Sequence, residues 1–93
     1  MLIMDDELLI KLAYVNISTY RAKATKALKG DVKTPTKLAE ETGIRKNHIS
    51  KVLRDLKREG IAECVNEDAH RGRLYRLTDI GEGIVDSVVL ERK

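Results

Sequence analysis

The stretch "GIRKNHISKVLRDLKREG", residues 43–60, constrains the fold of this chain most. Its two bounding glycines predict a helix over about 45–59, because glycine commonly ends helices and permits the turns between them. At 100° per residue, three further apolar side chains fall within about 60° of Ile49. They are Val52, Leu53 and Leu56. This helix therefore has to bury a narrow apolar stripe against a core.

The opposite side of the same helix is basic. Four long polar side chains lie about 140–200° from Ile49, on an outward ridge roughly 16 Å long at 1.5 Å per residue. They are Asn47, Lys51, Arg54 and Arg58. Ser50 and Lys57 flank the ridge. Such a face is either an ordinary solvated helix surface or a surface shaped to meet an anion, and the neighbouring segments decide between the two.

The rest of the chain predicts a small α+β domain, mainly α with one β-hairpin. The segments "IAECVN" and "RLYRLT" have the composition of short strands, and the "EDAHRG" between them that of a hairpin loop. We expect Tyr20 to lie on the buried stripe of the second helix. Apolar spacing and capping residues predict the other helices over about 6–15, 18–29, 34–42 and 79–91. All 93 residues then form a single domain.

The composition narrows the function classes. One Cys and two His are scattered along the chain, and no acid–base pair stands out beside a nucleophile. We therefore expect no enzyme activity, no metal site, no cofactor and no evident small-molecule ligand. The lone Cys64, the absence of a secretion signal and the lack of a run of ~18 apolar residues predict a cytoplasmic protein that does not enter a membrane. Residues 34–60 carry seven bases and four acids, whereas residues 79–93 carry two bases and four acids.

The segment before the basic helix carries a recognisable spacing. Leu38, Ala39, Gly43, Ile44 and Ile49 have the spacing of a helix-turn-helix, in which a small residue lets the helices approach and a glycine permits the turn. Thr42 departs from that pattern, since an apolar residue is common there. The motif continues into "REGIAECVNEDAHRGRLYRLTDIG". Residues 34–81 together resemble the winged helix-turn-helix transcriptional regulators, especially MarR-like and related archaeal types.

The resemblance implies a three-helix core with a wing and flanking N- and C-terminal helices. The helix-turn-helix would span about 34–59 and the wing about 61–78. The basic helix would enter the major groove of double-stranded DNA, and the wing would contact the backbone or minor groove. Arg54 and Arg58 suit phosphates, whereas earlier residues suit base edges. The full set of candidate DNA contacts is Thr34, Thr36, Lys37, Arg45, Lys46, Asn47, His48, Ser50, Lys51, Arg54, Arg58, His70, Arg71 and Arg73.

The terminal helices have more apolar positions than a capping helix needs. They either pack on the core or form a homodimer interface, and a two-fold DNA site favours the dimer. The candidate interface residues are Leu8, Leu12, Tyr14, Ile84, Val85, Val88 and Val89. The alternatives to a sequence-specific regulator are a winged-helix module that binds protein and a non-specific architectural DNA-binding protein.

Overall fold

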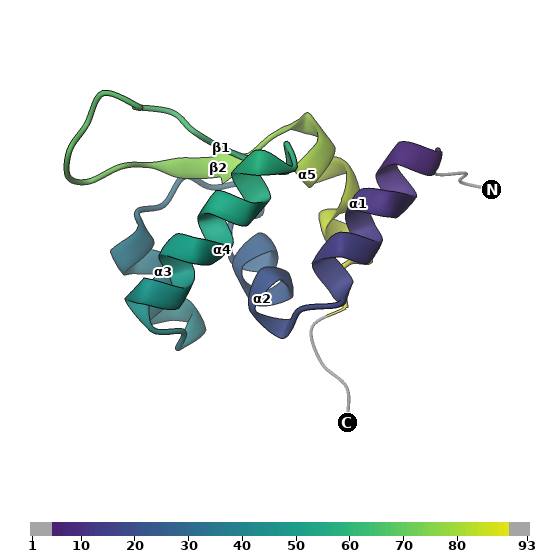
Figure 1. The fold of residues 1–93 in the computed structure, drawn as a ribbon, viewed down its shortest axis with the longest axis horizontal. Coiled ribbons are helices and arrows are strands. Elements are labelled where there is room, and N and C mark those ends of the chain that lie inside the picture. The colour runs from purple at the N-terminus through teal and green to yellow at the C-terminus, as the bar shows by residue number, and fades with distance from the viewer. Residues whose placement is uncertain (1–4, 90–93) are drawn as a thin grey trace.

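The structure, a computed structural model, describes residues 5–89 and confirms the α+β fold class (Figure 1). Its elements follow the predicted order of four helices, a hairpin and a last helix. Their bounds are α1 (Asp6–Asn16), α2 (Thr19–Ala27), α3 (Pro35–Thr42), α4 (Lys46–Arg58), β1 (Ala62–Cys64), β2 (Tyr75–Leu77), α5 (Asp79–Ile84) and the 3₁₀ turn η1 (Val85–Ser87).

Side-chain caps set the start of four of the five α-helices. In each, the side chain of the N-cap residue accepts a hydrogen bond from the backbone N–H three residues later, at 3.0–3.2 Å. These caps are Asp5, Ser18, Thr34 and Thr78. The exception is α4, whose N-cap Arg45 makes no side-chain cap. The first backbone N–H groups of α4 are therefore not satisfied by a capping side chain.

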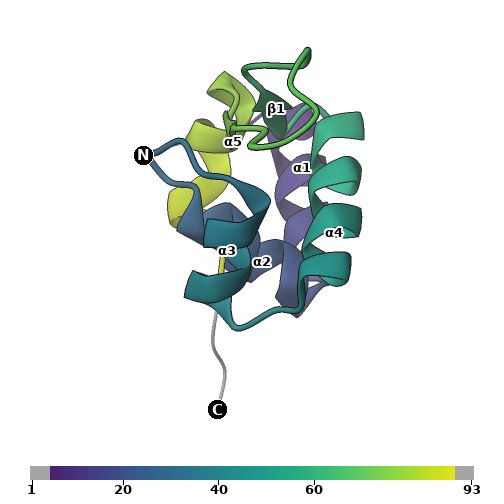
Figure 2. The ribbon, with the colours of Figure 1, turned by 90° about the vertical axis from the view of Figure 1, so that its left-hand side faces the viewer.

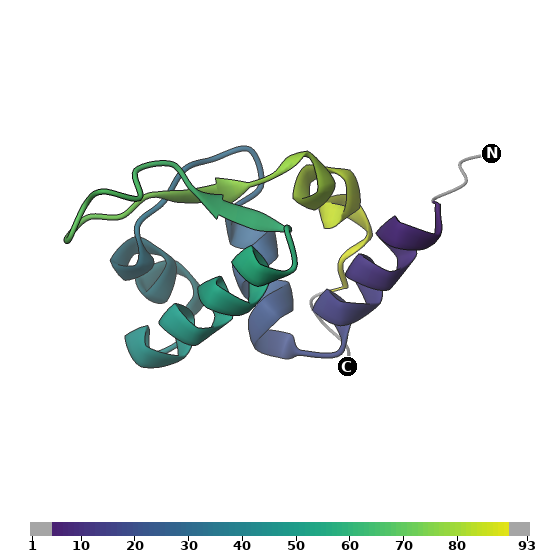
Figure 3. The ribbon, with the colours of Figure 1, turned by 45° about the horizontal axis from the view of Figure 1, so that its top comes forward.

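The hairpin pairs β1 with β2 in antiparallel register, with Ala62 opposite Leu77 and Cys64 opposite Tyr75. A third segment joins its edge. Lys33 and Tyr75 exchange two backbone hydrogen bonds, each 2.9 Å long. The sequence did not predict this bridge. It fixes the chain just before α3 to the hairpin, so that the start of α3 lies beside the hairpin loop (Figure 3).

The core is aliphatic, because the chain has no Phe or Trp. Helices α2, α3 and α4 pack against one another around Leu28, Leu38 and Leu53, all of which are buried. Helix α5 packs on α1 at one end of a molecule 43 × 31 × 19 Å in extent, and the hairpin loop extends beyond α3 and α4 at the other end (Figure 1). The two ends are thus built from different elements.

Two predictions about the helices are wrong. The last helix was expected to reach residue 91, but α5 ends at Ile84 and the chain is extended at Val88. The backbone N–H of Val89 instead donates to the side-chain oxygen of Asn16 at 3.0 Å. Valines and two glycines have low helix propensity, which favours the early end of α5, and the contact with Asn16 holds the chain that follows η1. Residues 90 and 91 lie outside the described residues. Tyr20 is 42% exposed rather than buried.

Candidate nucleic-acid interface

The turn between α3 and α4 has the geometry of a helix-turn-helix. Gly43 adopts a left-handed conformation with φ of 76°, which a side chain would disfavour, and its N–H donates to Ala39 at 2.9 Å. The hydroxyl of Thr42 donates to the carbonyl of Leu38 at 2.6 Å and accepts from the N–H of Ile44 at 3.2 Å. Thr42 therefore holds the turn by hydrogen bonds at a position where other sequences use an apolar contact.

Helix α4 presents the face that its sequence predicts. Ile49, Leu53 and Leu56 are fully buried. Within residues 5–89, no ion pair engages Arg45, Lys46 or Arg54, so these cations are available to an anion outside the chain. All the candidate DNA contacts on this segment are exposed: Arg45, Lys46, Asn47, His48, Ser50, Lys51, Arg54 and Arg58.

A groove of about 590 Å³ lies between the hairpin loop, the start of α3 and the first turns of α4. Seen from the loop end, α3 and α4 lie beneath the hairpin (Figure 2). The structure thereby brings together seven candidate DNA contacts that the sequence placed in three separate segments. They are Thr34, Thr36, Lys46, Ser50, His70, Arg71 and Arg73, and Pro35, Gly72 and Tyr75 complete the lining.

The hairpin loop is held by its own side chains. Asn66 accepts from the N–H of Leu74 at 2.7 Å and donates to the carbonyl of Gly72 at 3.2 Å. Arg73 donates to two loop carbonyls, those of Glu67 and Ala69, at 3.0 and 2.9 Å. Arg73 thus shapes the loop, a role that sequence reasoning missed, as it missed Asn66.

An ion pair ties the loop to α4. The amino group of Lys57 lies 2.8 Å from a carboxylate oxygen of Glu67. The hydrogen bond between them raises the pKa of Lys57 and lowers that of Glu67. Arg71, by contrast, is exposed at the loop tip beside Gly72, whose φ of 66° makes the turn. Arg71 is therefore exposed to solvent, whereas Arg73 makes hydrogen bonds within the loop.

Comparison with known proteins rests on structure, because no protein-family model and no curated protein sequence matches the chain. A MarR family transcriptional regulator from Silicibacter pomeroyi DSS-3 aligns with a TM-score of 0.67, at 16% identity over 88% of this chain. An apo form of a ZitR mutant from Lactococcus lactis gives 0.66, at 20% identity over 85%. A further MarR family transcription regulator gives 0.59, at 25% identity over 86%. The chain has the winged-helix fold of MarR-like regulators.

The likeness concerns only part of each neighbour. The chain covers 61%, 60% and 59% of the three neighbouring chains, about three fifths of their length. In winged-helix terms, α3 and α4 form the helix-turn-helix, α4 takes the position of the helix called the recognition helix in this fold, and the β1–β2 hairpin takes that of the wing. None of the described helices is long and apolar enough to span a membrane. Among residues 5–89, no group of three His, Cys, Asp or Glu side chains could hold a metal ion.

Helix α4 itself contains a buried acid that sequence reasoning missed. Asp55 is 6% exposed and lies 3.1 Å from Lys51, 3.2 Å from Arg58 and 3.8 Å from Arg21 of α2. Burial opposes ionisation of Asp55, but the hydrogen bond from Lys51 and the three positive charges outweigh it and lower its pKa. The sequence does show that Asp55 lies at helical spacing from Lys51 and Arg58. It does not show the third partner, Arg21, because that residue is distant in the sequence.

Two other candidate contacts lean away from the groove. The ring of His48 lies 5.4 Å from that of Tyr20 on α2, in a tilted arrangement. Lys37 lies 3.7 Å from Glu41 one turn later on α3. Both side chains remain exposed, but neither is directed at the wing.

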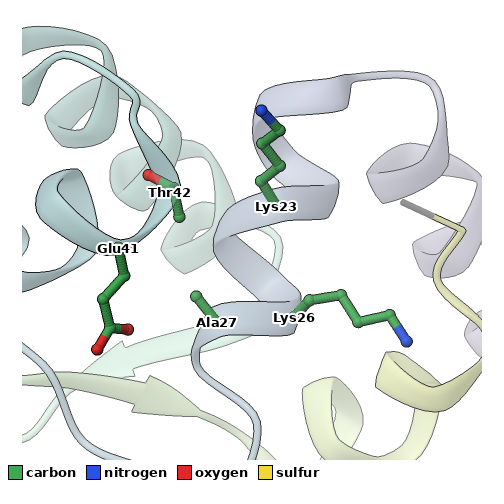
Figure 4. Close-up of a pocket in the computed structure, with 5 residues that line it drawn as sticks. All are labelled: Lys23, Lys26, Ala27, Glu41 and Thr42. Carbon is green, nitrogen blue, oxygen red and sulfur yellow. The ribbon is translucent and has the colours of Figure 1, made fainter. Parts of the chain in front are cut away.

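A second pocket, of about 320 Å³, lies between α2 and α3. Lys23, Lys26, Ala27, Glu41 and Thr42 line it. The two amino groups point away from the Glu41 carboxylate, and so do not converge on one point (Figure 4). This pocket therefore offers no set of charges aimed at a common ligand.

The structure corrects the position of most candidate dimer contacts. Ile84, Val85 and Val88 are 0–4% exposed within the single chain, because the short α5 and η1 fold back onto the core. Leu8, Leu12 and Tyr14 are half-buried and pack against that core. Of the seven, Val89 alone is exposed, at 48%.

The outer face of α1 carries apolar side chains that the sequence did not single out. Leu9 is 49%, Ile10 67% and Ile17 79% exposed. Together with the exposed Ala13 they recur at helical spacing along one side of the helix. The helix thus has two apolar faces, of which only the one with Leu8 and Leu12 is covered.

Proposed function

We propose that the chain binds double-stranded DNA in a sequence-specific manner and regulates transcription. The observation that carries this proposal is the single groove on which the start of α3, the recognition helix and the wing converge. A recognition helix fits the major groove of B-DNA, and a loop beside it reaches the backbone or the adjacent minor groove. Cations on both elements that have no ion-pair partner among residues 5–89, Lys46 and Arg54 on the helix and Arg71 on the wing, match a polyanion that passes between them.

The residues take different roles in this proposal. Asn47, exposed in the first turn of α4, has the amide geometry to pair with adenine, and Arg45 or Lys46 with guanine acceptors. Arg54, two turns later, contacts a phosphate. At the start of α3, Thr36 holds a second phosphate, since the cap residue Thr34 takes the N–H of Lys37 and not that of Thr36. Phosphate contacts supply salt-sensitive affinity and base contacts supply discrimination.

We further propose that the working unit is a homodimer in the cytoplasm. The uncovered apolar face of α1, with Ile10 and Ile17, supports a second copy of the chain as its partner. This face lies at the end of the molecule opposite the wing loop (Figure 1), so pairing through it leaves both recognition helices exposed. Cys64 is buried and unpaired, which agrees with a reducing compartment.

The deciding experiment selects bound sequences from a pool of random duplexes at near-physiological salt. We expect enrichment of an inverted repeat whose half-site spacing reports the separation of two recognition helices. A matched variant with Lys46→Glu and Arg54→Glu should lose binding while keeping its melting temperature. Retention of DNA without sequence preference would instead support an architectural protein, and no retention at all would leave the protein-binding alternative.

A further inference from the structure

The exposed surface of the recognition helix divides into two rows. At 100° per residue from Ile49, one row lies roughly 60–140° around the helix on the wing side. It contains Lys46, Ser50, Arg54 and Lys57. Two of these line the groove and Lys57 contacts Glu67 of the wing, which places the row against the wing. We call it the wing-side row.

The other row lies roughly 100–180° around the helix in the opposite sense and faces α2. His48 contacts Tyr20 of α2, and Asp55 contacts Arg21 of the same helix. Lys51 and Arg58 direct their charged groups to Asp55 at 3.1 and 3.2 Å. The cations of this α2-side row are therefore paired with an acid of the chain itself, whereas Lys46 and Arg54 of the wing-side row have no ion-pair partner among residues 5–89.

The burial of Asp55 makes this arrangement hard to undo. A buried carboxylate requires nearby positive charge and hydrogen bonds, because it has lost its hydration. If Lys51 and Arg58 turned to phosphates, Asp55 would retain only Arg21, at 3.8 Å. The side chains of Lys51 and Arg58 are about two-thirds exposed, so they could reach DNA if the carboxylate were removed.

We propose that Asp55 selects which cations of the recognition helix contact DNA. It withholds Lys51 and Arg58 on the α2 side, so Lys46 and Arg54 of the wing-side row and Arg71 of the wing make the contacts. Fewer phosphate contacts lower the affinity for random DNA and raise the ratio of specific to non-specific binding. Asp55 is thus a positioning residue for specificity. This inference rests on the DNA binding proposed above.

The test measures affinity for a random-sequence duplex by fluorescence anisotropy over about 50–300 mM salt, where each phosphate contact contributes about 0.9 to the slope of log affinity against log salt. We expect Asp55→Asn to bind more tightly and to steepen the slope by about 1–2. The control is Glu59→Gln, which makes the same change of net charge on the same helix. Glu59 pairs with Lys11 of α1 at 3.2 Å, so this control releases no cation of the recognition helix, and its slope should match the wild type.

A second pair of variants keeps the test decisive if Asp55→Asn does not fold. Lys51→Met and Arg54→Met remove one charge each, three residues apart on one helix. We expect Arg54→Met to make the slope shallower by about 0.9 and Lys51→Met to leave it unchanged. Equal losses from both, or an Asp55→Asn slope no steeper than that of Glu59→Gln, would overturn the inference while DNA binding stands. A wild-type chain that binds no duplex would end the proposed function itself.

Discussion

At the scale of single residues, Thr42 departs from the helix-turn-helix pattern, in which an apolar residue is common at this position, and its hydrogen bonds explain why it fits. Its hydroxyl bridges the carbonyl of Leu38 and the N–H of Ile44. We expect Thr42→Val, which has the same shape without the hydroxyl, to lower the free energy of unfolding by about 1 kcal/mol. Thr42→Ser keeps both hydrogen bonds and should stay within about half of that loss. Urea denaturation of the two variants checks this, and equal midpoints would mean that the bridge contributes nothing.

Asp55 gives the stability of the protein a defined dependence on pH. Because its pKa is lowered in the folded chain, its contribution is fully present above the ordinary value of about 3.9 and is lost as the pH falls through the lowered pKa. At neutral pH, Asp55→Asn should lower the free energy of unfolding by about 1–3 kcal/mol. The difference from wild type should shrink below about pH 4.

Thermal melts of both proteins between about pH 7 and pH 3 measure this difference across the range where aspartate titrates. Asp68→Asn, in the exposed hairpin loop, serves as the control and should follow the wild type throughout. A deficit of Asp55→Asn that stays constant with pH would show that the lost interaction is not that of the ionised carboxylate.

At the scale of elements, α5 contains a matched pair of glycines. A Cβ at Gly81 would lie 2.2 Å from the carbonyl oxygen of Ile61, whereas a Cβ at Gly83 meets nothing within 4 Å. Gly81→Ala should therefore destabilise the fold by about 1–3 kcal/mol, because α5 could no longer lie as close to Ile61, the residue before β1. Gly83→Ala should stabilise it by up to about 1 kcal/mol through helix propensity. Denaturant midpoints measure both, and a tolerated Gly81→Ala would contradict this close packing.

The same scale shows what the sequence could predict and what it could not. The buried stripe of α4 and the caps at Ser18, Thr34 and Thr78 were predictable because they depend on residues within one or two turns. The course of the chain after α5 was not, because Val89 is held by a hydrogen bond to Asn16, which is distant in the sequence. The role of Asp55 was hidden for the same reason, since Arg21 reaches it from another helix.

At the scale of the whole molecule, the two ends carry different surfaces. The hairpin loop lies at one end and α1 at the other (Figure 1). Beside the loop, α4 carries cations with no ion-pair partner among residues 5–89, whereas α1 carries exposed apolar side chains. The helical spacing of the basic residues in the sequence predicted the basic surface of α4. On α1, the sequence predicted Leu8 and Leu12 as dimer contacts, because the sequence alone does not show which of the two apolar faces of α1 the core covers. In the folded chain Ile10 and Ile17 are the exposed ones, so the dimer contact proposed above rests on them.

The last prediction concerns this apolar end. In a two-fold interface each substitution occurs twice, so Ile17→Glu would place two carboxylates in a surface that must lose its water. We expect the dissociation constant of the dimer to rise at least about 100-fold, equivalent to about 2.8 kcal/mol. Val32→Glu, on a side chain 42% exposed in the segment before α3, should leave the dimer intact. Sedimentation velocity over a concentration series separates the two variants. A wild-type chain that stays monomeric throughout would mean that the outer face of α1 serves a different partner, and that one chain alone meets each DNA site.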